Sequence, residues 1–264
     1  MDLQLKKFDP SRIDDCRIVM IIGKRGTGKS VLAKDIMYHH KRIPMGVVMS
    51  GTEEGNGWYS NFVPDSFIYN DFDRDVVDNL IGRQRRLCKE DKVTNVFLVL
   101  DDCMYDKRIL KEKCMRSLFM NGRHFKIFLV ITAQYMGDVP PDIRTQIDYL
   151  IVCREPIIAN RERLHKNFFG MIPFRYFCAL LDKTTENYEC LVLDNTTHSN
   201  NVEDCLYWYK ARMDLDFKMG SASFWGYHSK HYNPNFDHEE DKRKLSNEKH
   251  QKTPRVNIVK LKKS

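Results

Sequence analysis

The feature that most constrains this chain is the segment Gly-Lys-Arg-Gly-Thr-Gly-Lys-Ser at residues 23–30. An apolar run, residues 18–22, precedes it, and a helical pattern that includes Leu32 and Ile36 follows it. The three glycines allow the backbone to curl so that successive N–H groups point at a phosphate, while the following helix presents its positive end. The spacing in this strand-loop-helix context predicts a P-loop, and so a nucleoside triphosphate site.

The P-loop residues have different predicted tasks. Lys29 is expected to reach the β- and γ-phosphates, and the hydroxyl of Ser30 is expected to hold Mg²⁺. The predicted nucleotide-binding residues are Gly23, Lys24, Arg25, Gly26, Thr27, Gly28, Lys29, Ser30 and Val31.

Further apolar runs alternate with helical patterns along the chain. We expect strands at residues 17–23, 46–52, 67–69, 95–100, 126–134 and 148–153, and helices at 29–40, 74–92 and 107–119. This alternation predicts an α/β fold with a doubly wound, mostly parallel sheet and helices on both faces. The carboxyl ends of the strands then meet at one edge, where ligands collect.

The chain of 264 residues is long enough for one main domain. We predict an ATPase domain over residues 1–215, with a core at about 17–155 and a C-terminal elaboration at 156–215. The elaboration is expected to contain helices at 157–169, 174–183 and 202–212 and a strand at 188–193. Residues 216–264 are polar and basic, which predicts a flexible tail and, with a net charge of +7, a polyanionic partner.

An acidic pair, Asp101-Asp102, ends the apolar run at 95–100. Asp101 is expected to hold the metal together with Ser30, and Asp102 to polarise the attacking water. A strand-ending carboxylate pair also occurs as a helix N-cap or a solvated turn. A strand and helix between the P-loop and this pair favour the ASCE, RecA-like subclass, in which a further strand lies between the P-loop strand and the metal-binding strand.

Three more side chains are candidates for catalysis. Gln134 ends the run at 126–134, beside the expected γ-phosphate, and can orient water. Arg123 and Arg144 flank that run, and either is a candidate for stabilising the transition state in a neighbouring subunit. Each arginine fits a surface ion pair equally well.

Two features of composition limit the alternatives. The eight cysteines are scattered singly, which indicates reduced thiols in a cytosol-like compartment. The N-terminus lacks the pattern of a signal peptide, and no apolar run approaches the roughly 20 residues of a membrane span, so we expect neither secretion nor a transmembrane segment. A glycine-rich segment also carries five aromatic residues, which we expect either to stack on a base or to cover the edge of the core: Trp58, Tyr59, Phe62, Phe67 and Tyr69.

Taken in order, five motifs resemble the genome-packaging ATPases of nucleocytoplasmic large DNA viruses, of the poxvirus and giant-virus type, in the FtsK-HerA superfamily. They are the P-loop, Leu-Val-Leu-Asp-Asp-Cys at 98–103, Asn-Gly-Arg-His at 121–124, Thr-Ala-Gln at 132–134 and Pro-Asp-Ile-Arg-Thr-Gln at 141–146. The resemblance covers residues 18–212. It implies ATP as the nucleotide. Many superfamily relatives have glutamate where this chain has Asp102.

The resemblance implies a ring of identical subunits that hydrolyses ATP and drives double-stranded DNA into a capsid. Capsid or virion-membrane proteins are then further partners, and the location is the host cytoplasm at viral assembly sites, or the virion. Two alternatives stay open at this point: a P-loop kinase acting on a small acceptor, and a nucleotide-dependent assembly scaffold with little turnover.

Overall fold

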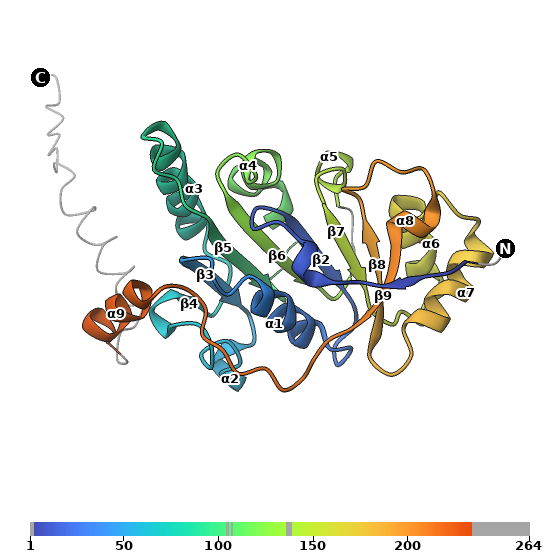
Figure 1. Ribbon diagram of the computed structural model, residues 1–264, viewed down its shortest axis with the longest axis horizontal. Coiled ribbons are helices and arrows are strands. Elements are labelled where there is room, and N and C mark those ends of the chain that lie inside the picture. The colour runs from blue at the N-terminus through green and yellow to red at the C-terminus, as the bar shows by residue number, and fades with distance from the viewer. Residues whose placement is uncertain (1–2, 104–105, 107, 136–138, 234–264) are drawn as a thin grey trace, which may run out of the picture.

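The computed structural model describes residues 3–103, 106, 108–135 and 139–233. Within these residues, nine strands form one sheet in the order β1-β9-β8-β7-β2-β6-β5-β3-β4 (Figure 1). The strands are β1 (Lys6–Lys7), β2 (Ile18–Ile22), β3 (Met45–Ser50), β4 (Ile68–Tyr69), β5 (Val96–Asp101), β6 (Ile127–Ala133), β7 (Tyr149–Val152), β8 (Glu189–Asp194) and β9 (Leu206–Lys210). Every pairing is parallel except β7 with β8 and β8 with β9, so the predicted mostly parallel α/β sheet is confirmed.

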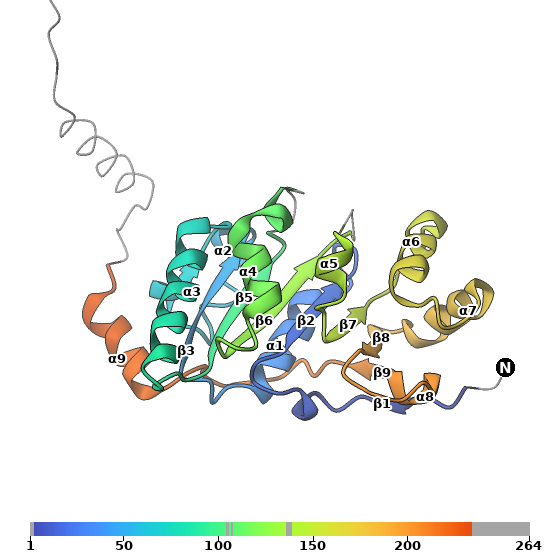
Figure 2. The same ribbon diagram turned by 90° about the horizontal axis from the view of Figure 1, so that it is seen from above.

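Helices cover both faces of the sheet (Figure 2). The α-helices are α1 (Lys29–His39), α2 (Glu53–Asn56), α3 (Arg74–Lys89), α4 (Lys113–Asn121), α5 (Pro141–Arg144), α6 (Ile158–Phe168), α7 (Phe174–Thr184), α8 (Val202–Cys205) and α9 (Ala222–His231), with 3₁₀ turns at η1 (Pro10–Arg12), η2 (Asp65–Phe67) and η3 (Ile109–Lys111). One core cluster joins the sheet to α3, α4, α6 and α7, and the other joins it to α1.

The central strands are buried on both faces, which explains their continuous apolar runs. β6 pairs with β2 on one side and with β5 on the other, in the register Ile22 with Ala133 and Leu100 with Ile131. A strand therefore separates the P-loop strand from the strand that ends in the acidic pair, as the ASCE interpretation predicts. The carboxyl ends of all three strands meet at one edge.

The prediction of a helix over residues 202–212 is wrong. Only α8 is helical, and residues 206–210 form β9, which pairs with β8 and with β1. The rings of Tyr207 and Tyr209 pack on Phe8, with centroids 5.7 and 6.2 Å apart. Aromatic side chains favour a pleated, half-buried surface, and pairing with distant strands decides the conformation here.

The sequence predicts a flexible tail from residue 216, but the structure shows ordered, packed residues over the first part of this stretch. Phe217, Met219 and Phe224 are buried, and α9 packs beside η2. Phe217 lies 4.9 Å from Phe62 between ring centroids, and the Met219 N–H donates to the carbonyl of Phe62. Because most residues of this stretch are polar, its composition did not reveal that three apolar side chains would pack on the core. The rest of the expected tail, residues 234–264, lies outside the described residues.

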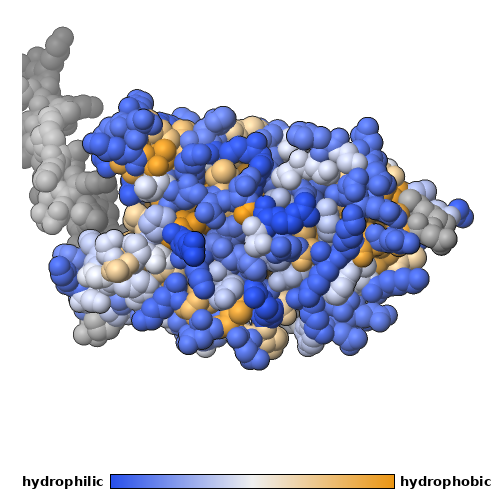
Figure 3. All heavy atoms as spheres, in the orientation of Figure 1, coloured by the Kyte–Doolittle hydropathy of each residue, from blue (hydrophilic) through white to orange (hydrophobic). Residues whose placement is uncertain are grey.

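The surface seen in Figure 3 is mostly hydrophilic, with small separated apolar patches. Within the described ranges, no helix is both long enough and apolar enough to cross a membrane.

Candidate active site

The P-loop connects β2 to α1 with a backbone that only glycine accommodates easily. Gly28 has φ +89° and precedes α1, and a Cβ at Gly23 would lie 2.4 Å from Thr27 Oγ1 and 2.6 Å from Cys153 Cβ. The loop therefore curls against the end of β2 and presents the N-terminus of α1. Of the predicted nucleotide-binding residues, Arg25, Gly26, Gly28, Lys29, Ser30 and Val31 line a pocket of about 790 Å³, whereas Gly23 is buried beneath the loop.

Lys29 is held inside this pocket. Its side chain is 5% exposed, and its ammonium lies 3.3 Å from the carbonyl of Lys24 and 3.5 Å from Oδ1 of Asp102. An ammonium in this position supplies a positive point charge for a phosphate bound at the N-terminus of α1. Asp102 Oδ1 is buried and accepts no hydrogen bond from the residues that the structure describes. A buried carboxylate oxygen whose partner is an ion-paired lysine, with no hydrogen-bond donor among the described residues, keeps acceptor capacity for a ligand.

Asp101 lies deeper, at the end of β5, and is held by two hydroxyl groups. Ser30 Oγ donates to its Oδ2 at 3.0 Å and Thr132 Oγ1 donates to its Oδ1 at 2.5 Å. Burial raises the pKa of Asp101, with the negative charge of Asp102 adding to the rise and the hydrogen bond from Thr132 opposing it. A bound divalent cation would reverse this rise, because it favours the ionised carboxylate.

These groups fit Mg²⁺. The ion prefers hard oxygen ligands and keeps several waters, and Asp101 Oδ2 lies 3.0 Å from the Oγ of Ser30, which lines the P-loop pocket. Ser30 and Asp101 would hold the ion, as the sequence predicts. When bound, Mg²⁺ neutralises negative charge on the phosphates.

Gln134 completes the carboxyl edge. It follows β6, and its Nε2 donates to Oδ2 of Asp102 at 3.3 Å. The backbone N–H of Asp102 in turn donates to Thr132 Oγ1 at 3.0 Å, and Asp102 has φ +52°, an uncommon conformation that turns its carboxylate toward Lys29. Residues from β5, β6 and the P-loop thus converge on one point.

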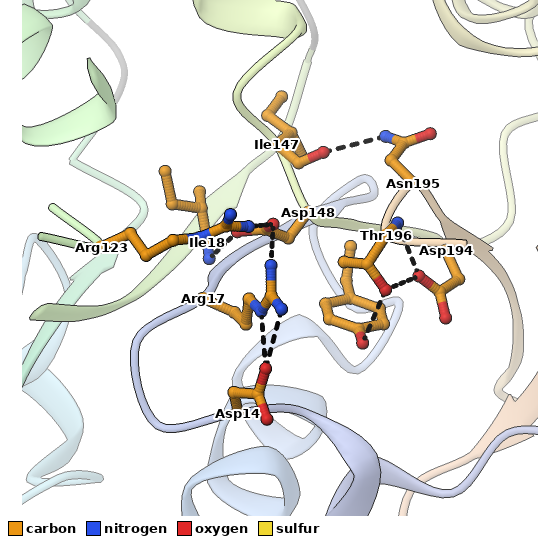
Figure 4. A network of polar contacts seen from close by, with 10 residues as sticks. Asp14, Arg17, Ile18, Arg123, Ile147, Asp148, Asp194, Asn195 and Thr196 are labelled. Atoms are coloured by element: carbon orange, nitrogen blue, oxygen red, sulfur yellow. Dashed lines mark hydrogen bonds and ion pairs between the residues drawn. The ribbon is translucent and has the colours of Figure 1, made fainter. Parts of the chain in front are cut away.

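Arg123 lies at the opposite edge of the sheet. It precedes β6, and its guanidinium contacts Asp148 Oδ1 at 2.9 Å (Figure 4). Arg17 donates to the same oxygen at 3.1 Å, and the N–H of Ile18 donates to Oδ2 at 2.9 Å. Arg123 is 57% exposed.

Arg144 belongs to α5 and is turned toward α6. It is half-buried, and its Nη1 donates to Oδ1 of Asn167 at 2.5 Å. Neither Arg123 nor Arg144 lines the P-loop pocket of its own chain. Their assignment to catalysis stays a prediction.

Comparison with known proteins identifies the family. The family model described as "Poxvirus A32 protein" matches residues 6–206. The chain belongs to the poxvirus A32 protein family. The chain is 36% identical over 214 residues to protein 015R of Frog virus 3. It is 32% identical over 244 residues to protein L437 of Acanthamoeba polyphaga mimivirus.

The matches differ in how much of each relative they cover. The match with the Frog virus 3 protein covers 79% of this chain and 66% of that protein. The match with the mimivirus protein covers 88% of this chain and 86% of that protein. A similar solved structure is the genome packaging NTPase B204 from Sulfolobus turreted icosahedral virus 2 in complex with AMPPCP. It shares 17% identity and a TM-score of 0.54 over 76% of this chain and 100% of B204, which supports the fold. The predicted family resemblance is confirmed.

Two residues that belong to motifs named from the sequence, but have no predicted role beside the acidic pair, contribute to the site. Thr132 joins Asp101 to the backbone of Asp102, and Tyr59 is fully buried with its hydroxyl near Asp101, whose negative charge helps burial to raise the pKa of the phenol. Alternation along a strand places residues 132 and 134 on the same side, which could have revealed Thr132. Tyr59 reaches the site only through the path of a loop, which no local pattern fixes.

Proposed function

We propose that the chain is an ATP-hydrolysing motor that moves double-stranded DNA into the viral capsid during virion assembly. The observation that supports it most directly is the convergence of Lys29, Asp101, Asp102 and Gln134 at the carboxyl ends of β2, β5 and β6. Membership of the A32 family and the fold shared with the packaging NTPase B204 support the same function.

The groups divide the work of phosphoryl transfer. Lys29 and the N–H groups of the P-loop bind the phosphates, while Asp102 and Gln134 orient a water molecule for attack on the γ-phosphate. Asp102 carries the general-base role because it lines the phosphate pocket and its Oδ1, although ion-paired with Lys29, accepts no hydrogen bond from described residues. Ser30 and Asp101 hold Mg²⁺.

A neighbouring subunit completes the site. Negative charge spreads over the equatorial phosphate oxygens in the transition state, and an arginine stabilises it. Since Arg123 and Arg144 both lie outside their own pocket, a head-to-tail ring in which one subunit presents an arginine to the next supplies that group. Arg123 is the more accessible of the two, because Arg144 is turned toward Asn167.

An ATPase assay titrated with duplex DNA at several salt concentrations tests the motor. We expect Mg²⁺-dependent hydrolysis that DNA stimulates, with stimulation falling steeply as salt rises, because phosphate contacts release counterions. The Lys29→Ala variant is the control for background activity. Hydrolysis no higher than that control, with and without DNA, would refute the proposal.

We place the motor at cytoplasmic assembly sites of infected cells or in the virion, with capsid or virion-membrane proteins as further partners. Fluorescence microscopy of a tagged chain during infection checks the location. A signal confined to the secretory pathway would contradict it.

A further inference from the structure

Two pockets flank the P-loop on opposite sides. The first is the pocket of about 790 Å³ that contains Lys29 and Asp102. The second, of about 670 Å³, lies between Gly26 and Thr27 on one side and the turn at residues 185–189 on the other, with Arg154 at its margin. A nucleoside triphosphate bound to the P-loop must direct its sugar and base toward one of them.

The position of the γ-phosphate decides the direction. If hydrolysis occurs as proposed above, the γ-phosphate lies beside Asp102 and Gln134, at the ends of β5 and β6. The second pocket lies on the other side of β2, because Arg154 follows β7 and Glu189 begins β8. A phosphate chain that starts near β5 and crosses the P-loop therefore carries the nucleoside toward β7 and the second pocket.

The turn between α7 and β8 presents an aromatic ring there. The N–H of Glu189 donates to the carbonyl of Glu186 at 2.9 Å and closes the turn, and its two central residues, Asn187 and Tyr188, have φ +50° and +63°. Such turns favour Asn followed by Gly, and a bulky side chain with positive φ is an outlier. An unfavourable residue retained in a turn suggests a function for its side chain.

The ring of Tyr188 is available for binding. Its side chain is 70% exposed, and its Cδ1 lies 3.7 Å from the point that a Cβ on Gly28 would occupy. Trp58, the aromatic residue of the first pocket, is less available, because the ammonium of Lys34 lies 5.3 Å from the centroid of its ring. The exposed ring beside the phosphate loop is thus Tyr188.

We propose that the turn at residues 186–189 forms the nucleoside subsite, in which the base of the bound triphosphate stacks on the ring of Tyr188. Base stacking on an aromatic ring needs no specific hydrogen bond. The carboxylate of Glu186 is an acceptor for the ribose hydroxyls. Arg154 lines the same pocket, and Asp182, the carboxylate that interacts with its charge, is already ion-paired with Arg161, so Arg154 can meet the phosphate chain. The subsite rests on the proposed function, since that function sets the direction of the phosphates.

Calorimetric titration without Mg²⁺, which prevents turnover, with ATP and inorganic triphosphate as the two ligands, separates the base from the phosphates. The Tyr188→Gly variant removes the ring and places glycine where φ is positive, so the turn is preserved. We expect its affinity for ATP to fall by about tenfold to a hundredfold, with its affinity for triphosphate unchanged. Tyr188→Trp should retain ATP affinity, and Lys29→Ala should lower the affinity for both ligands.

Two further variants keep the test falsifiable. Tyr227, in α9, is 54% exposed and distant in sequence, so Tyr227→Ala should leave both affinities unchanged. Wild-type ATP affinity in Tyr188→Gly, or an ATP-specific loss in Trp58→Ala in its place, would overturn the subsite. Because binding is measured without turnover, a chain that binds ATP through Tyr188 but fails to hydrolyse it would refute the motor and not the subsite.

Discussion

Carboxylates are held differently at the two ends of the central strands, which we call the carboxyl edge and the amino edge of the sheet. At the carboxyl edge, Asp102 has a buried oxygen without a hydrogen-bond donor among the described residues. At the amino edge, Asp148 accepts hydrogen bonds from Ile18, Arg17 and Arg123. Buried polar groups are normally satisfied within the protein, so an unsatisfied one points to a ligand. Beyond its ion pair with Lys29, Asp102 therefore keeps acceptor capacity for a ligand, whereas Asp148 is already hydrogen-bonded by three groups of the chain.

The contrast bears on how Arg123 can act in another subunit. Its ion pair with Asp148 must break before the guanidinium reaches a neighbouring phosphate. The arginine is 57% exposed while Asp148 is 12% exposed, and surface ion pairs, the class that this solvated arginine resembles, contribute about 0–1 kcal/mol. Asp148 keeps Arg17 and the N–H of Ile18 after release. Breaking the ion pair between Arg123 and Asp148 therefore requires little free energy.

The largest expected effect is the loss of ATP turnover in Arg123→Ala and its partial recovery in rings mixed with a second variant. Arg123→Ala is expected to lower turnover by about 10³-fold or more, because a trans-acting arginine supplies that much of the rate. Lys29→Ala subunits are also inactive but retain Arg123. Mixing the two should restore part of the activity, measured as ATP hydrolysis against mixing ratio, since an intact pocket then meets an intact arginine.

The controls distinguish the two arginines. Arg144→Ala mixed with Lys29→Ala repeats the experiment for the less accessible candidate, and Arg108→Ala, which changes an arginine 87% exposed, should retain full turnover. If neither the Arg123→Ala nor the Arg144→Ala mixture regains activity, the contrast between the edges does not describe two halves of one site.

Asp102→Asn should have the next largest effect. The amide cannot accept a proton from water, so turnover should fall by about 10²-fold or more. Stability should change little, because asparagine tolerates positive φ well and Asp102 has φ +52°. Turnover and urea denaturation measure the two quantities. Unchanged turnover would favour an assembly scaffold over a motor.

The sequence predicted the parts of the molecule whose signals are local. The P-loop, the acidic pair and the strand ending in Gln134 each follow a continuous buried run, and parallel strands bring such ends together at one edge. Their catalytic roles stay predictions, since the structure shows position and not turnover. The subunit arrangement that would place Arg123 or Arg144 was not predictable either, because it depends on a second chain.

The parts that were missed depend on distant partners. β9 is a strand because β8 and β1 lie on either side of it, although its sequence follows a short helix. Phe217 packs because Tyr38 and Phe62 provide an apolar surface for it, and Phe224 packs on Phe67. Composition alone contains neither fact.

Asp148→Ala should reduce stability at the amino edge. It leaves the N–H of Ile18 and the guanidinium of Arg17 without their shared acceptor, which should lower the free energy of unfolding by about 1–3 kcal/mol. Urea denaturation measures the loss. Asp14→Ala is the matched control, because Asp14 also pairs with Arg17 but is 64% exposed, and it should cost less than about 1 kcal/mol. Equal losses in the two variants would mean that burial does not distinguish them.

The smallest effect concerns pH and His40, which follows α1. The imidazole is buried against Phe128, with ring centroids 4.1 Å apart, and its Nδ1 lies 2.5 Å from Asp15 Oδ1. Burial lowers the pKa of His40 below 6.5, although the hydrogen bond with Asp15 opposes the shift. The unfolded chain therefore binds the proton first, so the stability contributed by neutral His40 is full above pH 6.5 and is lost as pH falls toward the folded pKa.

One proton limits the slope to about 1.4 kcal/mol per pH unit. Denaturation curves between pH 7.5 and pH 5 should show a shallower decline in His40→Gln than in the wild type, whereas His124→Gln, at an exposed position of the same edge, should follow the wild type. Turnover of folded His40→Gln at pH 7.5 should be unchanged, because His40 lies at the opposite end of α1 from Lys29. A loss of turnover there would show that the amino edge affects the phosphate pocket within one chain, which would undo the separation of the two edges.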